Sequence, residues 1–182
     1  MTDYKAALIE ARARLGALLD GIDDDTFNAK PGPSSWSAAE CVVHLNKTHA
    51  PYLPVLEEKA ALSRPRASGP FRYGFVARRF IEGMKPGTRP VPTSGALKPP
   101  ATNGLASDID RARAVSRFES DVDRILADMD AADGLDLAKI KMRSPVIPLL
   151  RMPLGAFFLL LGNHALRHVD QAERAVEAAR AD

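Results

Sequence analysis

The chain of 182 residues contains one cysteine, Cys41, so it cannot form an internal disulfide bond. Chains with so few cysteines are typical of a reducing compartment, and we expect the protein to be cytoplasmic. The chain also lacks a large excess of positive or negative charge, because its formal net charge is only +2 at pH 7. With 6% aromatic residues, the chain offers neither the basic face nor the stacking platform of a nucleic-acid-binding domain. We therefore expect no nucleic-acid partner.

Long uninterrupted apolar runs are lacking as well. The first residues are polar and lead into an amphipathic pattern, without the apolar core of a signal peptide. The most apolar stretch, 145–162, is interrupted by Pro148, Arg151 and Pro153, so we do not interpret it as a membrane span and expect no membrane partner. The length of the chain favours one domain, which we place at 1–182.

Apolar residues recur at helical spacing in four long segments. These segments cover residues 3–22, about 37–62, 107–130, and a last one that begins near 153. No stretch shows the alternation of a strand convincingly, so the sequence predicts an all-α domain, most simply a four-helix bundle. The segment 132–152 is predicted to be a loop with a short element near 135–140.

Several helix ends have local signals. Ser37 followed by Glu40 predicts a capping box, in which each side chain bonds the backbone N–H of the other residue. Ser107 is a candidate N-cap for the third helix, and the aspartates at 23–25 should end or fray the first.

Prolines predict further boundaries. Pro51 and Pro54 should kink or restart the second helix, because each lacks a backbone donor and clashes with the preceding turn. Pro153 suits the first position of the fourth helix, where a missing N–H is not needed.

The segment 63–103 differs from the rest in composition. It holds seven of the fourteen prolines and eight lysine or arginine residues against one acidic residue, Glu82. A short helix over 73–83 is predicted within it, and the remainder should be extended loop. We interpret it as a Pro- and Arg-rich insertion between the second and third helices that packs over the bundle. The alternative, contact with nucleic acid, would use Arg64, Arg66, Arg72, Arg78 and Arg79.

The four histidines, His44, His49, His164 and His168, carry most of the information about function. The last two lie one turn apart on one helical face, where both can bind the same ion. Three neutral imidazoles are enough to hold a divalent metal and leave a coordination position open. The pair alone is also a common pattern of buried histidines, so the prediction depends on a third ligand.

Either of the two upstream histidines can supply this third ligand. His44 and His49 lie on one predicted helix with side chains roughly 140° apart, so only one can face the site. Gln171 follows His168 by three residues and is either a hydrogen-bond partner of a ring or a bound water, or an exposed helical glutamine. Cys41, one turn before His44, is either a thiolate ligand or nucleophile or, as we favour, a small apolar residue near the helix start.

Two runs of the sequence resemble the motifs of a known family. Residues 36–45, WSAAECVVHL, resemble the WS-x-x-E-x-x-x-HL signature of the DinB-like (DNA-damage-inducible) superfamily. Residues 163–171, NHALRHVDQ, resemble its C-terminal H-x-x-x-H-x-x-Q motif, and the order and separation of the two motifs agree. The resemblance covers roughly 3–62 and 105–178, whereas 63–103 has no counterpart.

The resemblance implies a four-helix bundle, often a homodimer, in which three histidines bind a divalent metal such as zinc or nickel. By position, the ligands in this chain are His44, His164 and His168. Members of the family include metal-dependent transferases that use low-molecular-weight thiols, such as mycothiol or bacillithiol, and a maleylpyruvate isomerase. The family name comes from damage-induced expression and implies no binding to DNA.

We therefore expect a metal-dependent enzyme with a small-molecule substrate, either a low-molecular-weight-thiol S-transferase or a hydrolase. The open metal position would stabilise the thiolate of a cosubstrate or hold a water of lowered pKa. Thr48, Tyr52 and Gln171 are candidates to line the site. The alternatives are a metal-binding stress or binding protein without turnover, which a closed pocket would favour, and a helical bundle without metal.

Overall fold

The computed structural model describes residues 1–182 apart from 63–66, 90–91, 94, 101, 103 and 182. The described part is mostly helical, as expected for an all-α fold, and adds one small antiparallel hairpin. Its elements in chain order are α1 (Thr2–Asp20), α2 (Asp24–Asn28), α3 (Ala38–Ala60), α4 (Phe75–Gly83), the 3₁₀ helix η1 (Gly95–Leu97), α5 (Arg111–Ala131), β1 (Lys141–Arg143), β2 (Arg151–Pro153) and α6 (Leu154–Ala181).

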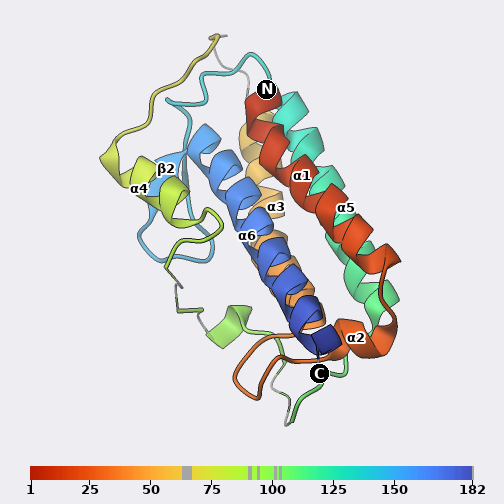
Figure 1. The fold of residues 1–182 in the computed structure, drawn as a ribbon. Helices are drawn as coiled ribbons and strands as arrows, with labels where there is room; N and C mark the ends of the chain where they lie inside the picture. Colours follow the sequence, from red (N-terminus) through yellow and green to blue (C-terminus); the bar gives the residue numbers. More distant parts are fainter. Residues whose placement is uncertain (63–66, 90–91, 94, 101, 103, 182) are drawn as a thin grey trace.

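The long helices α1, α3, α5 and α6 pack along one another (Figure 1). α1 and α6 run in the same direction: Arg14 pairs with Glu173, and farther along both helices Arg180 donates to the carbonyl of Gly21. These contacts place the histidine-bearing helix α6 beside α1 on one side and beside α3 on the other.

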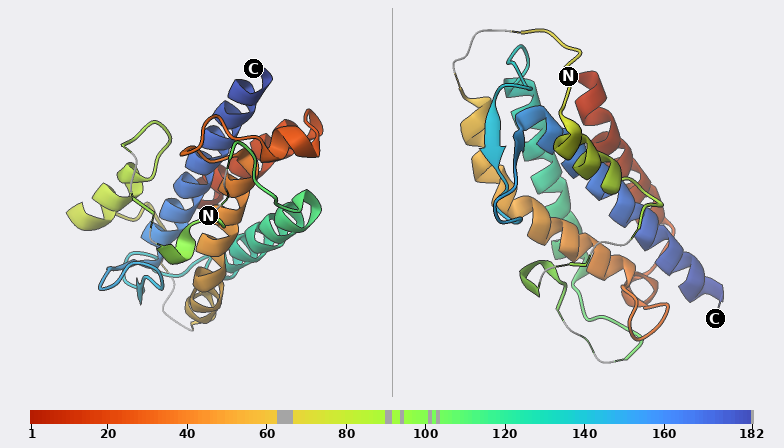
Figure 2. Two further views of the ribbon diagram at one scale, coloured as in Figure 1. Left: turned by 90° about the horizontal axis from the view of Figure 1, so that it is seen from below. Right: turned by 90° about the vertical axis from the view of Figure 1, so that its left-hand side faces the viewer.

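α3 and α5 also run in the same direction. The Asn46 amide donates to the carbonyl of Ala114 near the helix starts, and Glu57 pairs with Arg124 farther along. Consecutive antiparallel helices need only a short loop, but parallel neighbours need a long crossover. Residues 61–110 return from the end of α3 to the start of α5 (Figure 2). The segment predicted as an insertion therefore lies within a connection that the topology requires.

α4 belongs to this crossover and packs against α6 (Figure 1). It begins at Phe75, close to the predicted start at Tyr73. Of the arginines considered for nucleic-acid contact, Arg78 and Arg79 are exposed on α4, whereas Arg64 and Arg66 lie outside the described residues.

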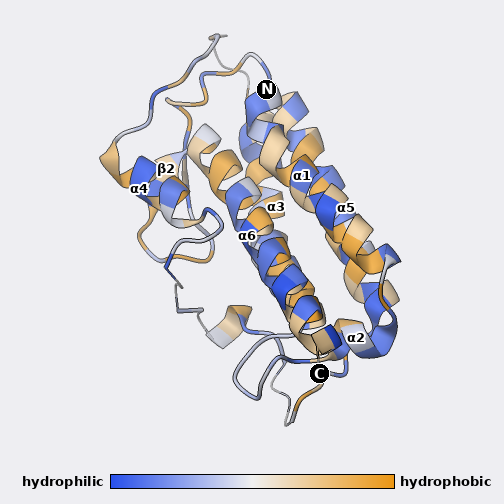
Figure 3. Cartoon of the chain, in the orientation of Figure 1, coloured by the Kyte–Doolittle hydropathy of each residue, from blue (hydrophilic) through white to orange (hydrophobic). Residues whose placement is uncertain are grey.

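The core lies between the four long helices. Figure 3 shows hydrophilic and hydrophobic bands alternating along each of them, as in amphipathic helices. Complete burial of a large apolar side chain stabilises the fold by roughly 1.5–3 kcal/mol, so the predicted stripes hold the helices together. The largest fully buried side chains are Tyr52, Phe27, Phe118, Phe157, Phe158, Leu8, Leu15, Leu45, Leu53, Leu56, Ile125 and Met129.

One helix start is confirmed and another is corrected. In the capping box of α3, Ser37 Oγ accepts from the Glu40 N–H at 3.0 Å, and Glu40 Oε2 accepts from the Ser37 N–H at 2.9 Å. Ser107 is not the N-cap of the third helix. Asp110 caps α5 instead, because its carboxylate accepts from the N–H of Arg113.

α1 ends at Asp20, before the aspartates at 23–25, as predicted, and Asp23 then starts a further helix, α2, by accepting from the Thr26 N–H. Two other local predictions are corrected. Pro153 ends strand β2, and α6 begins one residue later. The loop predicted over 132–152 contains the β1–β2 hairpin, and residues 135–140 form turns.

α3 continues through Pro51 and Pro54 as one helix, so the predicted restart is wrong. Each proline removes a backbone hydrogen bond. The neighbouring Leu53 and Leu56 are completely buried, and this packing offsets the local loss. Among the described residues, none of the helices is both long and apolar enough to span a bilayer.

Two helical glycines predict opposite effects of substitution by alanine. A Cβ at Gly162 of α6 would lie 3.0 Å from the Cβ of Ala7 and 3.4 Å from the backbone nitrogen of Leu8, whereas nothing lies within 4 Å of one at Gly16 of α1. Because alanine is the better helix former by about 1 kcal/mol, Gly16→Ala should raise the free energy of unfolding by up to that amount.

Gly162→Ala must separate α1 from α6 and should lower the free energy of unfolding by about 1–2 kcal/mol. Urea unfolding followed by circular dichroism measures both variants. Equal stabilisation by the two substitutions would contradict the close contact of α1 with α6.

Candidate metal centre

Three histidines meet between α3 and α6, which run antiparallel. His44 of α3 lies against His164 and His168 of α6, with ring centroids 5.1 and 4.4 Å away, and farther along α3 Tyr52 lies against Phe157. One nitrogen of each histidine lies within 4.8 Å of the others. All three side chains are buried, with 3–9% of their surface exposed. The structure thus brings together the three ligands that the family resemblance implied.

Hydrogen bonds fix the tautomers of two rings. The Nδ1–H of His44 donates to the carbonyl of Leu97 at 2.8 Å, and the Nδ1–H of His168 donates to Oε1 of Gln171 at 3.1 Å. The proton on Nδ1 leaves a lone pair on Nε2 of each ring, and Nε2 of His44 faces Nε2 of His164. Gln171 therefore makes the hydrogen bond to a ring that its spacing suggested, and such partners orient metal-binding histidines in many proteins.

The separation of the ring nitrogens fits a metal. Nε2 of His44 and Nε2 of His164 are 3.3 Å apart. Two nitrogens bound tetrahedrally at usual zinc distances would be about 3.3 Å apart, so this pair needs no rearrangement to share an ion. Among the described residues, Nδ1 of His164 is buried without a hydrogen-bond partner. The donor set of three imidazoles suits zinc and nickel alike.

All three rings are neutral at pH 7. Burial is the largest cause that lowers the pKa of His168, to about 3, and the charge of His44 acts in the same direction. Burial also holds the pKa of His164 well below its usual value, followed by the charges of His168 and His44. For His44, burial lowers the pKa against the opposing hydrogen bond to Leu97. Neutral imidazole is the form that binds a metal.

Trp36 forms one wall of the site. Its ring centroid lies 5.0 Å from that of His44 and 5.8 Å from that of His168. The half-buried indole directly precedes the capping box of α3, so the start of that helix fixes its place. Its apolar face excludes water from this side of the two imidazoles.

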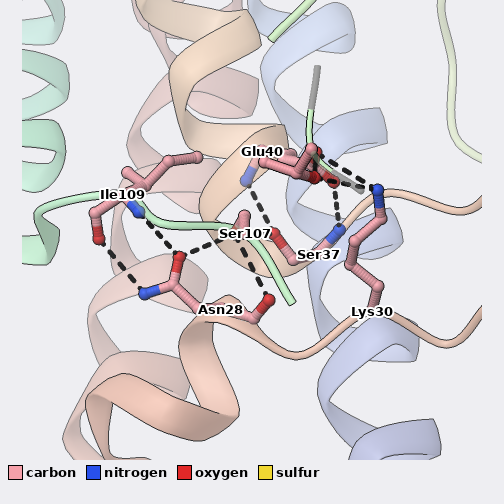
Figure 4. A network of polar contacts seen from close by, with 7 residues as sticks. Asn28, Lys30, Ser37, Glu40, Ser107 and Ile109 are labelled. Carbon is pink, nitrogen blue, oxygen red and sulfur yellow. Dashed lines mark hydrogen bonds and ion pairs between the residues drawn. The ribbon is translucent and has the colours of Figure 1, made fainter. Parts of the chain in front are cut away.

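A buried polar network holds the loop before α3 (Figure 4). Nζ of Lys30 lies 3.5 Å from Oε1 of Glu40, and both side chains are almost fully buried. Ser37 Oγ bonds Ser107 Oγ at 2.9 Å, and Ser107 Oγ donates to Oδ1 of Asn28 at 2.6 Å. Loss of one partner of a buried ion pair leaves an unpaired charge, so the network strongly fixes this loop and the tryptophan in it.

The crossover contributes directly to the site. Leu97 of η1 supplies the carbonyl that binds His44. Arg167, the residue before His168, fastens another part of the crossover to α6, since its guanidinium donates to oxygens of Gly83, Thr88 and Arg89. Burial lowers the pKa of Arg167, and the positive charge of Arg174 adds to this effect.

A pocket of about 660 Å³ opens beside the three histidines. The predicted lining residues Thr48, Tyr52 and Gln171 all border it. The Tyr52 hydroxyl bonds Ser144 Oγ at 2.8 Å, and burial raises the pKa of the phenol, which therefore stays protonated. Lining residues that the sequence did not indicate are Trp36, Met84, Pro92, Thr93, Leu97, Val146, Ile147, Leu160, Arg167, Arg174 and Ala175, with Pro31, Ser34 and Ser35.

Comparison with protein families agrees with this geometry. The sequence pattern of the DinB superfamily matches residues 7–172. This chain belongs to the DinB superfamily. The two motifs quoted above, 36–45 and 163–171, both lie within the matched range. Searches of curated proteins and of solved structures found no match.

Two alternative ligands lie apart from the site of this DinB-superfamily chain. His49 is fully buried, with its ring stacked 6.1 Å from Phe118 of α5. Cys41 lies in the core, where burial, followed by the charge of Glu40, raises the pKa of its thiol far above the usual value. A thiol held in this state is not a thiolate ligand or nucleophile, as the favoured interpretation of Cys41 predicted.

The bond from His168 to Gln171 predicts a weaker metal site in Gln171→Ala. Loss of such a partner typically lowers metal affinity by about 10–100-fold, because the ligand ring loses its fixed orientation. Competition with a chromophoric chelator measures the affinity for zinc. Glu177→Ala, an exposed change on the same helix, is the control. Equal affinities of the two variants would contradict the role of Gln171.

His49 predicts a specific loss of stability in acid. Burial lowers its pKa to about 4, and both ring nitrogens lack hydrogen-bond partners among the described residues. The unfolded chain takes up the proton near pH 6.5 while the folded chain does not, so this contribution to stability is full above pH 6.5 and declines toward pH 4. This lowering of the His49 pKa corresponds to about 3 kcal/mol in the free energy of unfolding.

The test compares the free energy of unfolding of the unchanged chain with that of His49→Leu. The first minus the second should fall by about 3 kcal/mol between pH 7 and pH 4. The other buried histidines are common to both proteins and cancel in this difference. Urea unfolding at each pH measures it. A difference that does not change with pH would show that His49 is not held neutral by burial.

Proposed function

We propose that this chain is a divalent-metal-dependent enzyme with His44, His164 and His168 as metal ligands. It bonds the sulfur of a low-molecular-weight thiol to an electrophilic carbon of a small substrate: the thiol proton is released when the thiolate forms, and the electron pair displaced on the substrate takes up a proton from solvent. The observation that carries the proposal is the meeting of three neutral imidazoles at the side of an open pocket. Membership of a superfamily that includes metal-dependent enzymes supports it.

A divalent metal at this site supplies a Lewis acid that stabilises a thiolate at neutral pH. The protein's own groups prepare the site for it. The carbonyl of Leu97 and the amide oxygen of Gln171 keep the protons of His44 and His168 on Nδ1. Nε2 of each of these two rings is then available to bind the metal. Trp36 excludes water on one side, and the protonated Tyr52 offers a neutral polar contact in the pocket.

The lining of the pocket favours thiol transfer over hydrolysis. Hydrolysis benefits from a carboxylate or free imidazole that accepts a proton from water. Among the described residues of the lining there is no aspartate or glutamate, and its histidines are the three proposed ligands. A thiol stabilised as thiolate is itself the nucleophile and needs no such base during the attack.

The size of the pocket argues against a binding protein without turnover. A pocket closed by Phe157, Phe158 or the segment 63–103 would favour that alternative. Both phenylalanines are completely buried in the core, and the crossover borders the pocket and leaves about 660 Å³ free. A space of this size accepts a small molecule next to the metal.

The proposal includes the remaining expectations from the sequence. Zinc or nickel is the metal, the enzyme is a cytoplasmic homodimer, and residues 1–182 form one domain. The single buried Cys41 is compatible with a reducing compartment.

Metal content tests the proposed centre. The purified, untagged protein, incubated with zinc or nickel and dialysed, should contain about one equivalent of metal per chain by elemental analysis. The double variant His164→Ala/His168→Ala should contain none, because one remaining imidazole does not hold the ion. His49→Leu is the matched control, since it removes a buried histidine outside the site, and it should keep the metal. Equal metal content in the double variant and the control would overturn the proposed ligand set.

A further inference from the structure

The charge around the pocket is one-sided. Among the described residues that line it, the ionised groups are the guanidinium groups of Arg167 and Arg174, and neither aspartate nor glutamate is present. A divalent metal held by three neutral imidazoles would add two further positive charges. Arg174 is exposed and has an ion-pair partner outside the lining, Asp170, whereas the positive charge of Arg167 is partly withdrawn from water and needs a negative partner that the lining does not supply.

Arg167 is the clearest case. Its guanidinium is half-buried and donates to four oxygens, all of them uncharged: the carbonyls of Gly83, Thr88 and Arg89 and the hydroxyl of Thr88, at 2.6–3.3 Å. Within the described part of the chain it makes no ion pair. These bonds hold the guanidinium in place beside His168 but leave its charge uncompensated.

Arg174 lies two turns farther along the same edge of α6. It pairs with Asp170, which does not line the pocket and also lies 3.6 Å from Arg14. Two guanidinium groups thus line one edge of the pocket, and Asp170 pairs with that of Arg174, so an anion that enters beside Arg167 can accept charge-assisted hydrogen bonds there.

The other end of the pocket is apolar. Leu160 lies on α6 about 16 Å before the midpoint between the two arginines, measured along the helix axis. Tyr52, Val146 and Ile147 border the same end, which the contact of Tyr52 with Ser144 and Phe157 places at the start of α6. The three histidines lie between the apolar and the cationic ends.

We propose that the pocket takes an elongated anionic substrate, with a carboxylate or phosphate head between Arg167 and Arg174 and an apolar body directed toward Leu160. This deepens the function proposed above and rests on it in treating the pocket as the substrate site. The bond that reacts lies between the two ends of the substrate, next to the histidines.

Three probes of equal chain length test the proposal: octanoate, octyl phosphate and the neutral 1-octanol. The chain has one tryptophan, Trp36, which lines the pocket, so its fluorescence reports binding of each probe. The full chain is used after treatment with a chelator, so that direct binding of a head group to a metal does not contribute. At low salt, at least one anionic probe should bind about tenfold or more tightly than octanol. The tighter anion identifies the head group.

Four variants and one control assign the preference for anions to the two arginines. Arg167→Gln and Arg174→Gln should each reduce the ratio of anion to alcohol affinity, and the double variant should bring it close to one. Arg167→Lys loses most of the bonds to the crossover but keeps the charge, so it should keep more of the preference than Arg167→Gln. Arg113→Gln removes an exposed charge of α5 away from the pocket and should leave the ratio unchanged.

Equal affinities for all three probes would overturn the proposal, as would a preference for anions that survives in the double variant. These outcomes are separate from the test of the metal centre, because the probes are measured without metal. A protein that prefers anions but binds no metal would refute the proposed function and keep the anion site. A protein that binds metal but shows no preference for anions would keep the proposed metal centre and refute the anion site.

Discussion

Three neutral imidazoles are buried side by side between α3 and α6, and much of the structure serves to keep them neutral, oriented and partly shielded from water. Buried polar groups cost free energy unless they have partners. Two rings obtain one partner through Nδ1, from Leu97 and from Gln171. Nε2 of His44 lies 3.3 Å from Nε2 of His164, a separation that suits two ligands of one ion. A metal bound between these rings would take the place of the contact between the two Nε2 atoms.

The direction of the helices explains why the crossover takes part in the site. Because α3 and α5 are parallel, the chain must return along the length of the molecule between them. On its way it brings Leu97 to His44 and receives the anchoring bonds of Arg167. A segment whose length is required by topology thus supplies an acceptor for one proposed ligand and part of the wall of the pocket. Its many prolines suit an extended path without regular hydrogen bonding.

Local signals in the sequence were sufficient to predict the long helices and part of the site. Helical spacing of apolar residues predicted the four long helices, the capping box predicted the start of α3, and the i, i+4 pair placed His164 and His168 on one face. The choice of His44 over His49 came only from the family resemblance. The rotation of α3 about its axis depends on its packing against both α5 and α6, which spacing within one helix does not reveal.

The other features depend on contacts between residues far apart in the sequence. Nothing local to Leu97 or Arg167 indicates that one binds His44 and the other fastens the crossover, because their partners lie 53 and about 80 residues away. The same reason explains why α3 does not restart at Pro51 and Pro54, where tertiary packing outweighs a local helix-breaking preference. Ser107 had the right residue type for an N-cap, but its hydroxyl is bound to Asn28 and Ser37.

X-ray absorption spectroscopy of the zinc-loaded protein tests the central claim most directly, because it reports the type, number and distance of the atoms around the metal. Three imidazole ligands predict nitrogen scatterers at about 2.0–2.1 Å with the outer-shell pattern of three histidine rings. A shell without that pattern, or one containing sulfur from Cys41, would contradict a centre formed by His44, His164 and His168.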